Sequence, residues 1–371
     1  MPREHNPMPD IGAAMNPDLR RRVGRWFVIW TVMLFITIII GGITRLTESG
    51  LSITEWKPVS GVLPPLSAEA WAVEFDKYRQ IPQYQEVNRG MSLAEFKRIF
   101  WWEWIHRFWA RVVGLAIGLP ALVLLVRGGL SRVVTRRILL LLFLMAVQGA
   151  MGWYMVASGL SERTSVSQYR LAAHLSVALV LVGLAVWTAA DLLVRPPVMF
   201  ERRGSPEAAR RMRRLGMAFV ALVALTAVAG AFVAGLKAGH AYNTFPLMGG
   251  RVVPAGYRAL DPWWRNLFEH IPAVQFNHRL LGVLTTMAGL GLWKLARGAD
   301  QSDTVRRWGR AVGLMSLVQI ALGIATLLML VPISLAAMHQ AGAVVLLCFG
   351  LLLVHAARRS GDFADDAAQV R

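Results

Sequence analysis

The sequence predicts an all-α membrane protein whose eight transmembrane helices form two tandem, pseudo-symmetric four-helix bundles. Of its 371 residues 55% are hydrophobic and only 17% are charged, a balance typical of polytopic membrane proteins. Apolar runs recur that are long enough to cross a hydrocarbon core, which takes about 20 helical residues. Motifs in the first half of the chain also return in the same order in the second half.

Eight apolar runs define the predicted helices: 25–44, 107–126, 137–157, 171–194, 215–236, 276–296, 309–330 and 333–356. The first run is long enough to span the membrane and lacks a small-residue cleavage site, so we expect an uncleaved helix. Arginines gather before the first run and after the second, fourth and sixth, so the positive-inside rule predicts that both termini are cytoplasmic. The net charge of +18 therefore reflects the topology of a membrane protein, and no nucleic-acid partner is expected.

The predicted organisation is a cytoplasmic tail (1–24), an N-terminal four-helix unit (25–195), a basic cytoplasmic linker (196–214), a C-terminal four-helix unit (215–357) and a second cytoplasmic tail (358–371). Residues 41–50 align with 230–239, residues 148–152 with 319–323, and residues 172–174 with 337–339. Because each unit has an even number of spans, both units point the same way across the membrane.

Four histidines occupy matching places in the two units, near the outer starts of the second and fourth helices of each. They are His106 and His174 in the first unit, and His278 and His339 in the second. Two facing imidazoles in a helix bundle are the axial ligands that a haem iron needs, so we predict two haem sites toward the outer face. For any single histidine, an interhelical hydrogen bond is an equally good interpretation. The single cysteine, Cys348, excludes a thiolate cluster.

Polar neighbours of the histidines suggest further roles. Arg107 and Arg279 each follow a candidate ligand and could pair with a haem propionate, although snorkelling to lipid headgroups is the alternative. Glu103 stands three residues before His106, on the same helical face, whereas Gln275 stands three before His278. The difference suggests one reactive site and one electron-transfer site. As an alternative, Glu103 could be a solvated cap at the loop boundary.

Several strings together resemble the heme A synthase family, in its mitochondrial and alphaproteobacterial branch. They are residues 41–58, 100–107, 276–279 and 338–340, within a resemblance that spans about residues 25–357. The resemblance implies an oxidoreductase that converts the C8 methyl group of heme o to the formyl group of heme a through a hydroxymethyl intermediate. The chain departs from some bacterial members of the family, because they carry a cysteine pair in an outer loop and this chain has only Cys348.

The resemblance also implies roles for residues. His278 and His339 would bind the iron of a haem b cofactor, His106 and His174 would bind the substrate haem, and Glu103 would be catalytic. The implied partners are heme o, an electron acceptor whose identity the sequence does not reveal, the lipid bilayer and, as candidates, heme o synthase and terminal oxidase assembly factors.

Two other classes of function are alternatives to an enzyme. A two-haem membrane cytochrome that carries electrons without modifying a porphyrin fits the four histidines equally well, and only the Glu103/Gln275 difference and the family strings disfavour it. A transporter is disfavoured because no pair of Gly/Pro-broken helices lies at matched mid-membrane positions.

Overall fold

The computed structural model describes residues 11–369 apart from 13, 58–59, 161–162 and 195–203, with side chains up to residue 360. All regular elements in these residues are helical. The long helices are α1 (Pro17–Leu46), α3 (Leu93–Arg127), α4 (Arg132–Ala157), α5 (Gln168–Leu193), α6 (Pro206–Gly235), α8 (Ile271–Ala296), α9 (Asp303–Leu328) and α10 (Ile333–Gln369). Two shorter helices, α2 (Ala68–Tyr78) and α7 (Asn266–Glu269), lie in the connections.

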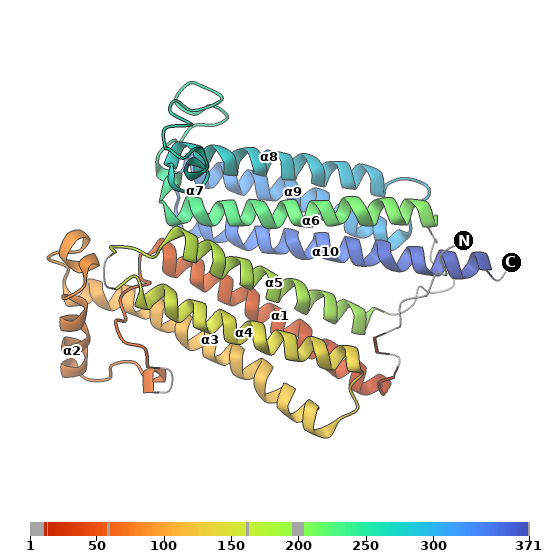
Figure 1. Ribbon diagram of the computed structural model, residues 1–371, viewed down its shortest axis with the longest axis horizontal. Helices are drawn as coiled ribbons and strands as arrows, with labels where there is room; N and C mark the ends of the chain where they lie inside the picture. Colours follow the sequence, from red (N-terminus) through yellow and green to blue (C-terminus); the bar gives the residue numbers. More distant parts are fainter. Residues whose placement is uncertain (1–10, 13, 58–59, 161–162, 195–203, 370–371) are drawn as a thin grey trace.

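Seven of the long helices in the described part of the chain are long and apolar enough to cross a membrane: α1, α3, α4, α5, α6, α9 and α10. The predicted class, an all-helical multi-pass membrane protein, is confirmed. The eighth helix, α8, has 26 residues and packs against α6 and α9 (Figure 1). It does not belong to the seven, so a count of eight spans stays a prediction.

The helices extend past the apolar runs that predicted them. Charged residues with good helix propensity continue a helix into the polar region beyond the bilayer. Thus α3 begins at Leu93, where Ser92 and Glu95 form a capping box, and α6 begins at Pro206, where the Ser205 side chain accepts from the Ala208 amide. The predicted linker is therefore helical from residue 206, and the predicted C-terminal tail continues α10. Residues 1–10 and 196–203 of the predicted tail and linker lie outside the described residues.

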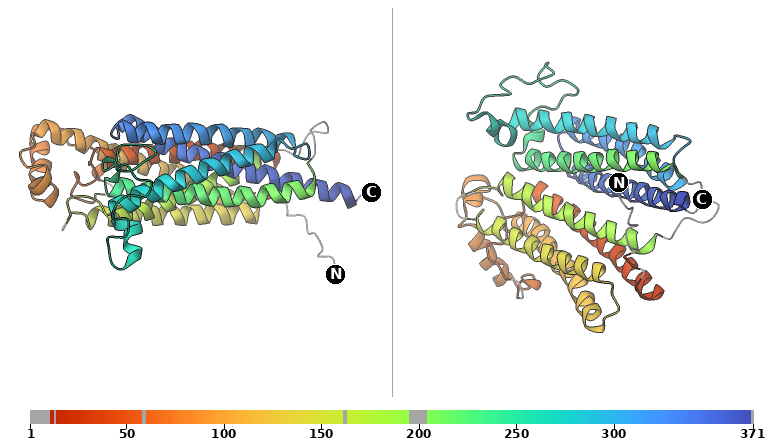
Figure 2. Two further views of the ribbon diagram at one scale, coloured as in Figure 1. Left: turned by 90° about the horizontal axis from the view of Figure 1, so that it is seen from above. Right: turned by 45° about the vertical axis from the view of Figure 1, so that its right-hand side comes forward.

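The helices form two similar bundles, α1 with α3–α5 and α6 with α8–α10 (Figure 2). In the first bundle α1 packs on α3 and α5, and α4 packs on α5; in the second, α6 packs on α8 and α10, and α9 packs on α10. Between the bundles α5 meets α10, while α6 packs on α5 and α1 on α10. Each contact has its counterpart, as a pseudo-twofold axis requires.

Contacts between equivalent residues locate this axis. Arg45 Nη2 donates to the Ala234 carbonyl at 2.9 Å, and Lys237 pairs with Glu48. Both pairs are 189 residues apart, which is the offset that aligns 41–50 with 230–239. Residues at equivalent positions can touch only near the symmetry axis, so the axis passes between the outer ends of α1 and α6.

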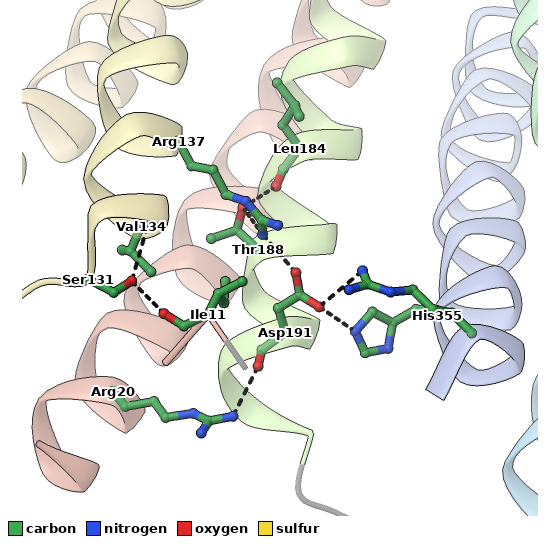
Figure 3. A network of polar contacts seen from close by, with 10 residues as sticks. Ile11, Arg20, Ser131, Val134, Arg137, Leu184, Thr188, Asp191 and His355 are labelled. Carbon is green, nitrogen blue, oxygen red and sulfur yellow. Dashed lines mark hydrogen bonds and ion pairs between the residues drawn. The ribbon is translucent and has the colours of Figure 1, made fainter. Parts of the chain in front are cut away.

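A polar network joins the bundles at their other end (Figure 3). Asp191 of α5 accepts from Arg137 Nη1 of α4 at 2.8 Å and contacts His355 Nε2 of α10 at 2.9 Å. Arg20 of α1 donates to the Asp191 carbonyl at 3.2 Å. His355 is thus a structural link between the halves.

The long connection between α1 and α3 packs on the outer end of α3. Leu51, Trp71, Phe75 and Tyr78 form a buried apolar cluster with Phe96, Phe100 and Ile81. This cluster holds the chain after α1 against α3, next to the first candidate ligand.

Candidate functional site

Each of the four histidines lies against a glycine of a neighbouring helix, and in each case the atom that faces the glycine is Cε1. A Cβ added to the glycine would lie 3.0 Å from Cε1 for Gly41 and His106, 3.5 Å for Gly152 and His174, 3.0 Å for Gly230 and His278, and 2.8 Å for Gly323 and His339. The glycines belong to strings that align between the halves. The repeat seen in the sequence therefore appears in space as four matched grooves, each of which receives an imidazole.

In the C-terminal half the two imidazoles face each other. The ring centres of His278 and His339 are 6.3 Å apart, and the ring planes are 82° to one another. A metal bonded to one nitrogen of each ring, at about 2.0 Å per bond, would separate the ring centres by roughly 6 Å. His278 Nδ1 lies 3.1 Å from the Thr226 carbonyl, so Nδ1 donates and Nε2 is left as the ligating nitrogen.

His339 has a different support. Gln319 Nε2 donates to the His339 carbonyl at 2.8 Å and lies 3.2 Å from Nδ1 of the same residue. In the sequence, Gln319 is notable only as the first residue of the string that aligns with residues 148–152. Its contact with a candidate ligand was not predicted, although the matching Gln148 in the other half was a signal that could have suggested it.

The N-terminal pair is arranged more loosely. Within the part of the chain that the structure describes, no ring contact joins His106 to His174. Nδ1 of both residues is buried without a hydrogen-bond partner, and His174 Nε2 lies 3.2 Å from Gln148 Nε2. Buried polar atoms are normally paired, so two orphaned imidazole nitrogens indicate that this pocket is built for a ligand.

The two arginines tie outer loops to the helices. Arg107 donates to the carbonyls of Ile53 at 2.9 Å and Glu55 at 3.1 Å. Arg279 donates to the carbonyls of Tyr242 at 2.6 Å and Thr244 at 2.7 Å. Both loops follow the first helix of their half, so the contacts are equivalent. Arg107 and Arg279 thus bind loop carbonyls and do not extend to lipid headgroups. Their contact with a haem propionate stays a prediction.

Glu103 is buried, with 2% of its surface exposed, so the interpretation as a solvated cap is wrong. Its Oε2 accepts from Ser52 Oγ and from the Ile53 amide, both at 2.8 Å, and its Oε1 pairs with Arg107 Nη2 at 2.6 Å. Ser52 and Ile53 come from the loop that the apolar cluster holds against α3, whereas Arg107 lies one turn further along α3. All three donors fix the position of the carboxyl group.

Gln275 occupies the equivalent place in the C-terminal half and is also 2% exposed. Its Nε2 donates to the Tyr242 carbonyl at 3.0 Å, while its Oε1 is buried without a partner. Both residues therefore hold the outer loop over a histidine pocket, but only Glu103 adds a negative charge. The asymmetry that the sequence predicted is present at matched positions.

The donor set fits an iron porphyrin. His278 and His339 face each other from two helices of one bundle, and each of the four imidazoles lies against a glycine that has no side chain to obstruct the ring. Among the described residues no cluster of three or more His, Cys, Asp or Glu side chains could hold a bare metal ion.

Known proteins are similar to this sequence along most of its length. Residues 24–351 match the family described as cytochrome oxidase assembly protein. The chain is 45% identical to a heme A synthase of Parvibaculum lavamentivorans, over 95% of this chain and 99% of that protein. It is 47% identical to a heme A synthase of Rhodospirillum centenum, over 91% and 89%, and 43% identical to one of Nitrosomonas eutropha, over 86% and 89%.

Proposed function

The chain belongs to the heme A synthase family, and from this premise we propose that it oxidises the C8 methyl group of heme o to the formyl group of heme a through a hydroxymethyl intermediate. The observation that carries the proposal is the pair of equivalent histidine pockets with different polar neighbours. One pocket has the geometry of a symmetric bis-imidazole site, and the other has orphaned imidazoles beside a buried carboxylate.

We assign His278 and His339 to a haem b cofactor. Their ring separation of 6.3 Å and the Thr226 carbonyl that orients His278 support this assignment. A bis-histidine haem b supplies one-electron transfer when bound. The neutral Gln275 beside it offers no acid or base, which suits a centre that carries electrons without reacting further.

We assign His106 and His174 to the substrate heme o, because the buried Nδ1 atoms of both residues have no hydrogen-bond partner in the protein. Oxidation of a methyl group releases protons together with electrons. Glu103, on the same helix and three residues before His106, is the group that we propose takes up such a proton or positions an oxygen nucleophile. The three donors around it fix the direction of the carboxyl group.

We further propose that the protein lies in a bacterial inner membrane, with both termini cytoplasmic and the haem pockets toward the outer face. The N-terminal end of α1 and the C-terminal end of α10 point toward the same side of the bundles (Figure 1), whereas His174 and His339 lie near the N-terminal ends of α5 and α10. Arginines gather at the start of α1 and after α3, α5 and α8, as the positive-inside rule expects of the cytoplasmic side. Heme o synthase would then deliver the substrate, and terminal oxidase assembly factors would receive the product.

The test is to express the protein in membranes supplied with heme o, purify it, extract the non-covalent haems and identify them by chromatography and mass spectrometry. We expect haem b together with heme a or its hydroxymethyl precursor. Haem b alone, with heme o available, would instead support a two-haem cytochrome, which the presence of a histidine pair in both halves would also suit.

A further inference from the structure

The glutamine that follows the candidate ligand His339 reaches across the interface between the two bundles. Gln340 of α10 donates through Nε2 to the Ile38 carbonyl of α1 at 2.8 Å. A Cβ on Gly42 would overlap the Gln340 Oε1 atom, so the amide group occupies the space that this glycine leaves open. Glycine is the residue type that allows another group to approach the backbone so closely.

This contact lies between the two candidate pockets. Gly42 directly follows Gly41, the glycine that faces His106 in the N-terminal pocket. Gln340 directly follows His339, a candidate ligand in the C-terminal pocket. Helix α1 is thus a wall of one pocket, and α10 supplies a candidate ligand of the other. The hydrogen bond of Gln340 ties the two together.

His339 is also held from a second side. Gln319 of α9 donates to the His339 carbonyl at 2.8 Å. The backbone at His339 therefore lies between two amide side chains, one that binds its carbonyl and one that follows it and binds α1. A polar contact within an apolar interface can fix the register of two helices even where it adds little to stability.

The equivalent contact between the bundles has no such polar link. The repeat relates the α1–α10 contact to the α6–α5 contact, where Ala231 takes the place of Gly42 and Leu175 takes the place of Gln340. Leu175 packs against the apolar cluster that contains Ala231. Apolar side chains are therefore sufficient to pack the bundles at α5 and α6. The amide occurs at the contact that adjoins His339, which points to a role in placing this ligand.

We propose that Gln340 is a positioning residue that fixes His339 of the C-terminal pocket relative to α1, the wall of the N-terminal pocket. The inference rests on the proposed function, because it takes His278 and His339 as the ligands of haem b. In that function electrons released in the N-terminal pocket pass to the C-terminal pocket, so turnover depends on how the two pockets are held. Groups that orient an axial ligand also tune the metal.

The experiment uses protein purified in nanodiscs with haem b bound. Gln340→Leu installs the residue type of the other half and removes the hydrogen bond to α1. The double variant Gly42→Ala/Gln340→Leu installs both residues of the equivalent contact, so that apolar packing replaces the polar link. Met338→Leu is the matched control, because Met338 also adjoins His339 but is 48% exposed.

Four properties are measured: the electron paramagnetic resonance spectrum of ferric haem b, its midpoint potential, turnover with heme o, and unfolding in detergent. We expect Met338→Leu to behave as the wild type. Gln340→Leu should keep haem b but shift its spectrum and its potential, because both depend on how the two imidazole planes are oriented. Its kcat should fall about tenfold or more with KM unchanged, since heme o binds in the other pocket.

The double variant separates positioning from packing. We expect it to unfold at the same detergent concentration as the wild type, because an apolar pair fills the contact, and to keep the shifted spectrum and the low kcat. Recovery of the wild-type spectrum and turnover in this variant would overturn the inference, since packing alone would then explain the contact. Loss of haem b from Gln340→Leu that the double variant repairs would have the same meaning.

An unchanged spectrum and potential of haem b in Gln340→Leu would also overturn the inference. These two measurements need no substrate, so they separate it from the proposed function. A wild type that binds haem b but does not oxidise heme o would overturn the proposed function alone, because the spectrum of Gln340→Leu would still decide whether this residue positions His339.

Discussion

The N-terminal and C-terminal halves share a scaffold but differ in the atoms around it. Each half sets two imidazoles against glycines and ties an outer loop down with an arginine. In the C-terminal half the two rings face each other at 6.3 Å beside a neutral amide, whereas in the N-terminal half both Nδ1 atoms lack a hydrogen-bond partner and a carboxyl group is buried nearby. A duplicated bundle can thus give the same pair of histidines different polar surroundings in each half.

Replacing the candidate histidine ligands should give the largest difference in haem content between the two halves. We expect His278→Ala or His339→Ala to lose haem b almost completely, because one imidazole cannot replace two axial ligands. His106→Ala or His174→Ala should keep haem b and lose heme o binding. Haem extraction followed by chromatography, with the reduced-minus-oxidised spectrum, measures both. A normal bis-histidine spectrum in His278→Ala would show that haem b is held elsewhere.

Exchanging the polar neighbours tests which half is reactive. Glu103→Gln gives the N-terminal pocket the residue type of the other half, and we expect methyl oxidation to fall at least about 100-fold, the scale of acid–base assistance. Haem content should be nearly unchanged. The reciprocal Gln275→Glu is the control and should retain most activity. Product formation per bound heme o is the measurement, and full turnover in Glu103→Gln would remove this carboxylate from the mechanism.

The connections between the halves are predicted to differ in strength. Asp191→Asn leaves Arg137 without its charged partner in a buried site, which costs about 3 kcal/mol or more. Glu48→Gln breaks the exposed pair with Lys237 and should cost less than about 1 kcal/mol. Unfolding of the purified protein in detergent would rank the two variants. Equal losses would mean that the network around Asp191 does not hold the halves together.

The smallest expected effect on haem binding comes from adding a methyl group to the glycines that face the histidines. Gly323→Ala places a methyl group 2.8 Å from His339 Cε1, so the ring must move, at a cost of about 1–3 kcal/mol. Gly152→Ala meets His174 at an ordinary contact distance of 3.5 Å and should be nearly neutral. Haem b occupancy after a mild wash should therefore fall only in Gly323→Ala. The opposite ranking would contradict the difference in packing between the halves.

Parts of the candidate site followed from the sequence, because they depend on local composition and on repetition. The apolar runs predicted the helices, the aligned strings predicted equivalent halves, and the four histidines lay at matching places in them. The contrast between Glu103 and Gln275 was visible as well. Helix ends were predicted less well, since charged residues continue α6 and α10 beyond their apolar runs.

The tertiary structure alone decided which atoms meet. Ser52 and Ile53 reach Glu103 from about 50 residues away, and His355 reaches Asp191 across 164 residues. The sequence left Glu103 open to a solvated interpretation, because Ser52 and Ile53 do not lie within a helical turn of it. Hydropathy and spacing report on a single helix, whereas burial and hydrogen bonding depend on how separate helices and loops pack. The sequence therefore determined the bundles and their candidate ligands, and packing decided which histidine rings face each other and which carboxyl group is buried.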